Sequence, residues 1–367
     1  MEDQDHTIQE GDIELSEADI EEYLQNFSVL PEHYDSFVRD NSFSLLKSRN
    51  QSGEDGLKKK KKFGLSLSGG GVRGYIEVLI LLRLQDKMKK DEVLEDKSVL
   101  DLFDFVAGTS IGGINALALA HNISLDQLVT LFKERAKKIF PSGLTLNKIK
   151  NIGMIRGGKF AVGKLEKQLT EFFGTTALKD LKKPILVTAC SSDHRPIIFS
   201  NEDPAHKDYL VADIGRCTSA APTYFNPKSL SDGNSYVDGG LFANNPSALL
   251  AGMMAKKFKV SSEDIVILSL GTGNNPDLPA RVIKNMGATK ITTILDMIMD
   301  STFKAVSQTM NMFLGEQYID INPPLKQIID LADSSKMDEM EKVVNEHSGR
   351  IDQLLDEFLE LYKNEQE

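Results

Sequence analysis

The residue with the clearest chemical potential is Ser110. It lies in Gly108-Thr-Ser-Ile-Gly112, a G-x-S-x-G sequence between an expected strand and an expected helix. In such a nucleophile elbow the turn is so sharp that the serine oxygen is exposed, and the residues two positions away must be small. The positive end of the following helix would favour a developing negative charge. The pattern also occurs in ordinary glycine-serine loops, so it predicts a nucleophile only together with other parts of a site.

A second glycine-rich turn, with Gly69, Gly70 and Gly71, follows an apolar run that alternates like a strand. Together with Gly74 these glycines satisfy G-x-G-x-x-G, the pattern of a dinucleotide pyrophosphate site. Such a site needs a strand that ends in an acidic residue about 20 residues further on. The sequence there is KKDEVLEDKS, a charged segment with no strand, and no Lys-Ser/Thr pair makes a P-loop. We therefore interpret the turn as a loop of N–H groups that stabilise an oxyanion.

A nucleophilic serine needs a group that accepts its proton. Asp238-Gly-Gly240 ends a short apolar run and offers a carboxylate, although Asp-Gly is also a common hairpin turn. His194 and His206, in loops between strands, are the only histidines placed to serve a Ser-His-Asp triad. In the order Ser, Asp, His of α/β-hydrolases the histidine would have to come later in the chain. The residues alone leave the identity of the base open.

Three motifs in a fixed order, GGGVRG, GTSIGG and VDGG, resemble those of the patatin-like phospholipases. The segments Cys217-Thr-Ser-Ala-Ala-Pro-Thr-Tyr-Phe225, Asn244-Asn-Pro246 and Ser269-Leu-Gly-Thr-Gly273 are also similar to this family. The resemblance covers residues 63–275. It implies a lipid acyl hydrolase with a Ser–Asp dyad in place of a triad.

The resemblance implies a role for each motif residue. Ser110 becomes the nucleophile and Asp238 the base, in a reaction that passes through an acyl-enzyme which water cleaves. The oxyanion loop consists of Gly69, Gly70 and Gly71, with Gly70 and Gly71 as the N–H donors, and Arg73 braces this loop. Gly108 and Gly112 shape the elbow, and Gly239 and Gly240 accompany the acid. No metal or other cofactor is expected, and the alternatives are a Ser-His-Asp esterase using His194 or His206, or a non-catalytic interaction module.

Strands and helices alternate from Phe63 onward, which is typical of a layered α/β fold. We expect strands at residues 63–68, 102–108, 183–191, 195–201 and 264–273, and helices at 74–88, 111–120, 125–140 and 164–173. A stretch rich in Met and Phe, 294–313, predicts a core helix or, alternatively, a flexible rim of an acyl pocket. The resemblance implies a three-layer α/β/α sandwich with a mostly parallel central sheet.

The charge distribution divides the chain into three parts. Residues 1–57 hold 15 acidic and 3 basic residues, although the whole chain has a net charge of -11, so the remainder is close to neutral. We expect an acidic, partly disordered extension at 1–57, a catalytic domain at 58–335 and an amphipathic C-terminal helix at 336–367. The extension could bind a protein partner or activator.

The composition limits the classes of binding partner and the cellular compartment that we expect. No basic face with interleaved aromatic residues is present, so we expect no nucleic acid. The family resemblance implies a phospholipid or another glycerolipid as substrate. Peripheral contact with a membrane surface is expected, to which five lysines at 58–62 could add attraction. No signal peptide or transmembrane segment is seen, and Cys190 and Cys217 cannot build a disulfide framework, which favours the cytoplasm.

Overall fold

The computed structural model describes residues 60–139, 160, 162–276 and 291–366. The chain divides into two units, Met1–Lys58 and Lys59–Glu367, and the fold presented here belongs to the second. The expected acidic extension at 1–57 lies outside the described residues, as do Lys58 and Lys59. No helix in the described ranges is long and apolar enough to cross a membrane.

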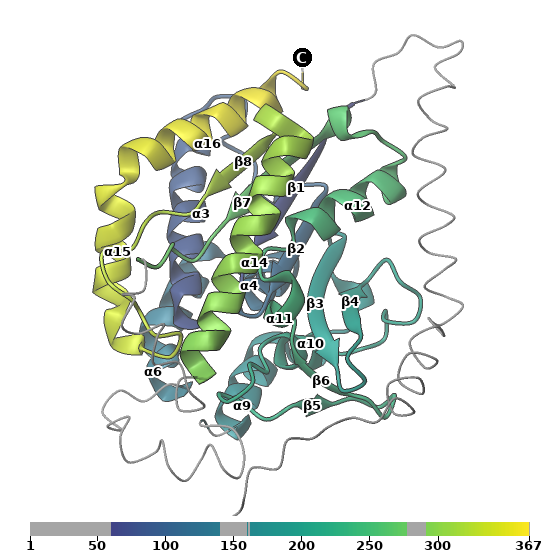
Figure 1. Ribbon diagram of the computed structural model, residues 1–367. Helices are drawn as coiled ribbons and strands as arrows, with labels where there is room; N and C mark the ends of the chain where they lie inside the picture. Colours follow the sequence, from purple (N-terminus) through teal and green to yellow (C-terminus); the bar gives the residue numbers. More distant parts are fainter. Residues whose placement is uncertain (1–59, 140–159, 161, 277–290, 367) are drawn as a thin grey trace, which may run out of the picture. The chain divides into compact units, whose positions relative to one another are not determined.

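Eight strands of the described residues form one sheet in the order β5-β6-β3-β2-β1-β7-β8, with β4 paired to β3 (Figure 1). Five neighbouring strands, β3, β2, β1, β7 and β8, are parallel, whereas β4 and β6 run antiparallel to β3. The strands are β1 (Lys62–Leu67), β2 (Phe105–Thr109), β3 (Ile185–Ser191), β4 (Pro196–Ser200), β5 (Lys228–Ser229), β6 (Ser235–Asp238), β7 (Ile265–Leu270) and β8 (Tyr318–Ile321).

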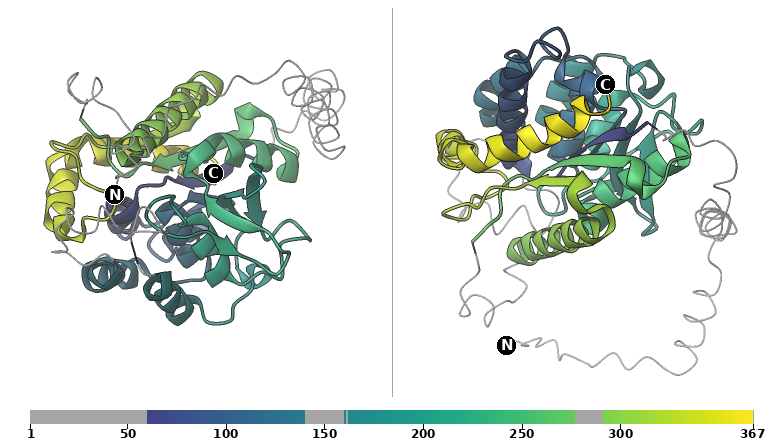
Figure 2. Two further views of the ribbon diagram at one scale, coloured as in Figure 1. Left: turned by 60° about the horizontal axis from the view of Figure 1, so that its bottom comes forward. Right: turned by 90° about the horizontal axis from the view of Figure 1, so that it is seen from above.

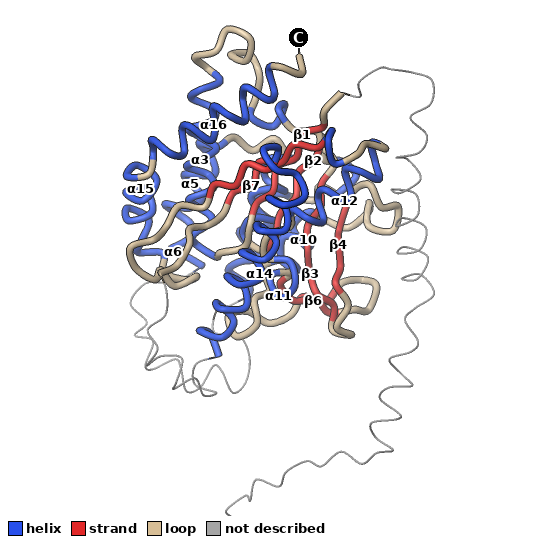
Figure 3. The backbone as a smooth tube through the Cα atoms, turned by 45° about the horizontal axis from the view of Figure 1, so that its top comes forward, coloured by secondary structure: helices blue, strands red, loops and turns tan. Residues whose placement is uncertain are grey.

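Helices cover both faces of the sheet. In the view from above in Figure 2, α14 lies on one side of the strands and α3 and α16 on the other, and Figure 3 shows the strands as one band between them. The α-helices are α3 (Tyr75–Met88), α4 (Ile111–Ala120), α5 (Leu125–Thr130), α6 (Ala136–Ile139), α9 (Val162–Phe173), α10 (Val211–Thr218), α11 (Gly240–Ala243), α12 (Ser247–Phe258), α14 (Ile291–Leu314), α15 (Met337–Glu346) and α16 (Ser348–Lys363). Shorter helical turns are η1 (Gly71–Gly74), η2 (Val99–Leu102), η3 (Leu131–Arg135), η4 (Leu178–Asp180), η5 (Ser262–Asp264), η7 (Gly315–Gln317) and η8 (Ser334–Lys336).

Two apolar cores, one on each face, hold the three layers together. Leu65 and Leu67 of β1 belong to a large core with residues of α3, α4, α10 and α16. Phe105 of β2 and Ile267 of β7 belong to a second core with α12 and the end of α14. Each such side chain contributes roughly 1.5–3 kcal/mol when it is fully buried. The expected three-layer α/β/α sandwich with a mostly parallel sheet is confirmed.

The C-terminal residues form two helices, α15 and α16, where the sequence predicted one. Helix α15 ends at Glu346 and α16 begins at Ser348, and both helices pack against the rest of the domain. Phe358 of α16 contacts the rings of Phe63 and Phe103, and Asp352 forms a salt bridge of 2.5 Å with Arg83 of α3.

The register along β3 brings the ends of β2 and β6 together. Thr109 of β2 pairs with Thr188 of β3, and Asp238 of β6 pairs with the next residue, Ala189. Strand β4 pairs with both of these β3 residues from the other edge, so β2 and β6 meet end to end on one edge of β3. The residue that follows Thr109 therefore lies beside Asp238.

The described part of the lysine run, residues 60–62, lies at the end of the sheet opposite to this point. Lys60, Lys61 and Lys62 stand at the beginning of β1, whereas Ser110 follows the end of the parallel strand β2. Lys62 lies 3.5 Å from Asp104, and the backbone N–H of Lys61 donates to Glu365. Lysines at this end are badly placed to hold a membrane against the end of the sheet where Ser110 lies.

Candidate active site

Ser110 occupies a sharp turn between β2 and α4. Its backbone has φ 55° and ψ −124°, a conformation that residues other than glycine rarely adopt and that costs of order 1–3 kcal/mol. The turn is so close to β1 that a Cβ on Gly112 would lie 2.4 Å from the Leu67 carbonyl oxygen. The backbone N–H of Ser110 donates to Oγ1 of Thr218 at 2.8 Å, which holds the strained residue in place.

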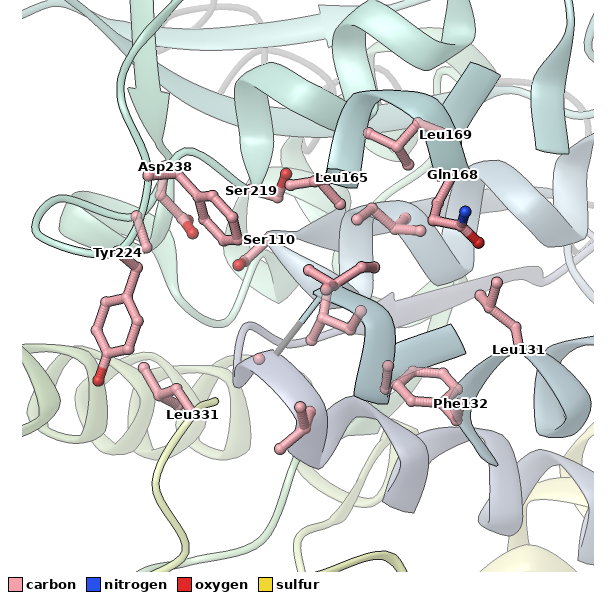
Figure 4. A pocket seen from close by; sticks show the side chains of 18 of the residues that line it. Ser110, Leu131, Phe132, Leu165, Gln168, Leu169, Ser219, Tyr224, Asp238 and Leu331 are labelled. Carbon is pink, nitrogen blue, oxygen red and sulfur yellow. The ribbon is translucent and has the colours of Figure 1, made fainter. Parts of the chain in front are cut away.

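Asp238 is a buried carboxylate at the end of β6, with only 3% of its surface exposed. Its Oδ1 accepts a hydrogen bond of 2.8 Å from Gly240 N–H, while Oδ2 has no hydrogen-bond partner among the described residues. Figure 4 shows the oxygen atoms of Ser110 and Asp238 directed toward one another.

The pKa of Asp238 is raised to about 6, because burial disfavours the charged form. The nearby Ser110 hydroxyl and the Gly240 N–H act in the opposite direction but are weaker. A carboxylate with this pKa is a stronger base than one in water and is still mostly ionised near neutral pH.

The glycine loop is held by its carbonyl groups. Thr272 Oγ1 donates to the Gly69 carbonyl at 3.0 Å, and the backbone N–H of Arg73 donates to the Gly70 carbonyl at 3.1 Å. The Arg73 side chain, which is buried, adds a longer contact of 3.4 Å from Nε to the same oxygen. These contacts support the expected bracing role of Arg73.

Two N–H groups of the loop remain available. Gly69 N–H donates to the Asn244 carbonyl at 3.0 Å, whereas those of Gly70 and Gly71 have no acceptor within the described part of the chain. Gly71 has φ +57°, and a Cβ there would lie 2.1 Å from the Leu331 carbonyl oxygen, so only glycine fits this turn. Without an acceptor among the described residues, these two N–H groups are free to donate to a ligand.

An apolar pocket, partly open to solvent, begins at Ser110 and Asp238. It passes between α4, η3 and α9, and Figure 4 shows Leu131, Phe132, Leu165 and Leu169 along it. Apart from Ser110 and Asp238, the side chains that line it are almost all apolar. The polar remainder comprises Ser219, Gln168 and the Tyr224 hydroxyl.

Neither histidine considered for a triad lines this pocket. His206 packs against Phe199, with ring centroids 5.2 Å apart, and burial lowers its pKa. His194 stands in an exposed turn with φ 65°. The structure thus gives no support to the alternative of a Ser-His-Asp triad.

Sequence reasoning missed the contributions of Thr218 and Thr272. Both lie in segments that the family resemblance had already singled out, but nothing in their type or spacing assigns them a role. Residues at and just after the end of α10 hold both site residues. Thr218 accepts from Ser110 N–H, and the Ala220 carbonyl accepts from Asp238 N–H at 3.1 Å.

Comparison with known proteins gives a consistent result. A sequence profile of the family described as "Patatin-like phospholipase" matches residues 65–251. A "cGAMP-activated phospholipase" of Escherichia coli is 34% identical over 221 residues, which cover 57% of this chain and 61% of that protein. A protein of the same name from Vibrio cholerae is 34% identical over 224 residues, 57% of this chain and 63% of its own length.

A plant relative matches over a longer region. The Arabidopsis thaliana protein named "Probable inactive patatin-like protein 9" is 30% identical over 277 residues, which cover 69% of this chain and 71% of that protein. The chain thus spans less than two thirds of the two bacterial relatives but more than two thirds of this one.

Proposed function

The chain belongs to the patatin-like phospholipase family, and from this premise we propose that it hydrolyses fatty-acyl ester bonds of phospholipids or other glycerolipids. The observation that carries the proposal is the position of Ser110 and Asp238, which face each other at one end of an apolar pocket. An apolar pocket that ends at a hydroxyl and a carboxylate suits an acyl chain with its ester group at the polar end.

In the proposed reaction Asp238 accepts the proton of Ser110 as the hydroxyl oxygen attacks the ester carbonyl carbon. The N–H groups of Gly70 and Gly71 stabilise the oxyanion that forms. Collapse of this intermediate breaks the ester bond, and the leaving alcohol takes the proton from Asp238. Water, deprotonated by Asp238, then attacks the acyl carbonyl carbon, the bond to the Ser110 oxygen breaks, and that oxygen takes the proton back from Asp238 as the fatty acid is released.

The electrostatics of the site support this assignment of roles. The raised pKa of Asp238, about 6, brings the base closer to neutral pH, where proton transfer from a hydroxyl is more effective. Ser110 lines the pocket, and α4 begins at the next residue, so the positive end of this helix lies beside the reacting centre.

The pocket supports the choice of an acyl substrate. Burial of an acyl chain contributes about 0.8 kcal/mol for each CH₂ group that leaves water. Leu165, Leu169 and Phe173 of α9 and Phe132 of η3 provide apolar surface along its length. Few polar groups line the pocket, so a polar substrate would find few hydrogen-bond partners there.

Exposed apolar side chains near the pocket support contact with a lipid surface. Met297 and Ile298 of α14 are 38% and 39% exposed, and their neighbour Met299 lines the pocket. Ile328, 49% exposed, lies three residues before Leu331, another lining residue. We propose that these side chains enter the lipid surface while an acyl chain moves into the pocket.

Release of fatty acids from mixed phospholipid vesicles, measured by mass spectrometry, tests the proposed function. We expect release by the full chain and none by folded Ser110→Ala or Asp238→Asn. His194→Ala serves as the matched control for the triad alternative and should retain the rate of the parent protein.

Each reaction is run with and without cGAMP, because two relatives are named cGAMP-activated phospholipases. Undiminished release by Ser110→Ala would refute the assigned nucleophile. No release under any of these conditions would favour the non-catalytic alternative, in keeping with the name of the plant relative.

A further inference from the structure

A buried carboxylate outside the proposed dyad connects the two glycine-rich turns. Glu77, the third residue of α3, has no exposed surface. Its Oε1 accepts a hydrogen bond of 2.7 Å from the backbone N–H of Ser68, and its Oε2 accepts one of 2.9 Å from Nδ2 of Asn115. Both oxygens of one side chain are thus engaged, each by a different segment.

The two partners of Glu77 belong to the two halves of the site. Ser68 immediately precedes the loop of residues 69–71, and Asn115 lies on α4, five residues after Ser110. Asn115 Nδ2 also donates to the Gly74 carbonyl at 3.2 Å, and Gly74 ends the helical turn η1 that continues from the loop. Through Glu77, the residue before the glycine loop is therefore connected to the helix that follows Ser110.

The surrounding packing leaves little room for adjustment. A Cβ on Gly74 would lie 2.6 Å from Cγ1 of Ile111, the residue after Ser110. Glycine at position 74 thus allows the end of η1 to come into close contact with the start of α4. Contact between apolar atoms alone does not fix how these two segments are rotated relative to each other. The two hydrogen bonds to Glu77 add a constraint of defined direction, and the Ser68 N–H is shared between Glu77 and the Leu270 carbonyl at 3.1 Å.

A carboxylate is an expensive means of filling a buried position. Burial raises the pKa of Glu77 well above its usual value, since the charged form is separated from water. Burial of an ionisable side chain costs more than burial of an apolar one unless it is hydrogen-bonded. The two hydrogen bonds to the site are what an apolar residue could not provide.

We propose that Glu77 is a positioning residue, which fixes the N–H groups of Gly70 and Gly71 relative to Ser110 by holding Ser68 and Asn115 together. This inference rests on the proposed hydrolysis through Ser110. Misplacement of reacting groups by about 1 Å can lower a rate roughly 100-fold, and loss of one oxyanion donor lowers kcat by about 100- to 1000-fold. Binding of the acyl chain should be unaffected, because Glu77 does not line the pocket.

The test measures kcat and KM for a soluble monomeric ester with Glu77→Gln, Glu77→Ala and Ser110→Ala. Glutamine is isosteric and can still accept from Ser68 N–H, but its amide group would face the Asn115 amide as a second donor. We expect kcat to fall about 10-fold in Glu77→Gln and about 100-fold in Glu77→Ala, with KM within about 3-fold of the parent value.

Asp320→Asn is the matched control for loss of a buried carboxylate. Asp320 on β8 accepts a hydrogen bond from Ser307 of α14, burial also raises its pKa, and it does not line the pocket. We expect this variant to keep the parent kcat. Thermal unfolding of every variant shows whether the protein assayed is folded.

Three results would overturn the inference. In the first, both Glu77 variants keep the parent kcat while Ser110→Ala is inactive, which leaves the proposed function intact. In the second, KM rises and kcat does not change, or kcat falls equally in Asp320→Asn. In the third, Ser110→Ala is as active as the parent protein, and the proposed function then fails as well.

Discussion

Replacing Asp238 by Asn should abolish activity and at the same time stabilise the folded protein. The pKa of Asp238 is about 6 in the folded state and 3.8 in the reference state, so the folded protein binds this proton more tightly. At 1.36 kcal/mol for each pKa unit, the ionised carboxylate costs the folded state about 3 kcal/mol. Asparagine removes the charge and can still accept the Gly240 N–H while it donates to the Ser110 hydroxyl.

The stability difference between the parent protein and Asp238→Asn should depend on pH. A carboxyl group with a raised pKa makes the parent protein lose stability as the pH rises from about 4 to about 6, and the full cost is present above pH 6. Asp238→Asn lacks this loss. The variant should therefore be more stable by about 3 kcal/mol at pH 7.5 and nearly equal at pH 4.

Urea unfolding of both proteins at pH 4, 5, 6 and 7.5 measures the difference, with Ser110→Ala as a control that keeps the carboxylate. Curves for the parent protein and Asp238→Asn that remain parallel over this range would refute the reasoning. They would mean that Asp238 is solvated, or paired with a cation, in the folded protein.

Three further predictions concern the base, the lipid surface and the elbow. With a soluble ester, the rate should fall about tenfold per pH unit below pH 6 as Asp238 becomes protonated, and a rate that is constant down to pH 4 would exclude this base. Met297→Glu with Ile298→Glu should slow hydrolysis of vesicle lipid at least 10-fold and leave soluble-ester hydrolysis unchanged, because only the former needs apolar contact. Met312→Glu is the matched control, since this residue is 82% exposed at the other end of α14; an equal loss in both variants would contradict the docking role. Thr218→Val removes the acceptor of the Ser110 N–H and should lower kcat about 10-fold, since a buried unpaired N–H costs about 1–3 kcal/mol, whereas an unchanged kcat would show that the elbow holds without it.

The fold class was predictable because its signals are local. The alternation of apolar runs with helical periodicity from Phe63 onward depends on which residues face the core, and both cores consist of apolar side chains from these runs. Glycines on both sides of Ser110 likewise report a turn that only small residues permit. Such signals are contained within a few neighbouring residues.

The convergence of the site depends on contacts between distant residues. Asp238 comes beside Ser110 because β6 pairs with β3 in the register that continues β2, and no periodicity within β6 encodes that register. From spacing alone, a hairpin turn explains Asp238-Gly239 better than a catalytic acid does. The family resemblance, and not the local sequence, selected the acid.

Helix boundaries within amphipathic stretches were the least predictable feature. The helix expected at 125–140 contains the wider turn η3, Leu131–Arg135, between α5 and α6. The C-terminal stretch divides into two helices before Ser348. Apolar spacing persists through both changes, so the periodicity does not reveal a break that the packing partners determine.

The most direct test of the central claim is the mass of the covalent adduct formed with an alkyl fluorophosphonate, mapped by peptide sequencing of the full chain with lipid present. We expect a single adduct on the Ser110 oxygen, formed in the parent protein and greatly slowed in Asp238→Asn. An adduct on a different serine, or labelling of Ser110 that is equally fast without the Asp238 carboxylate, would contradict it.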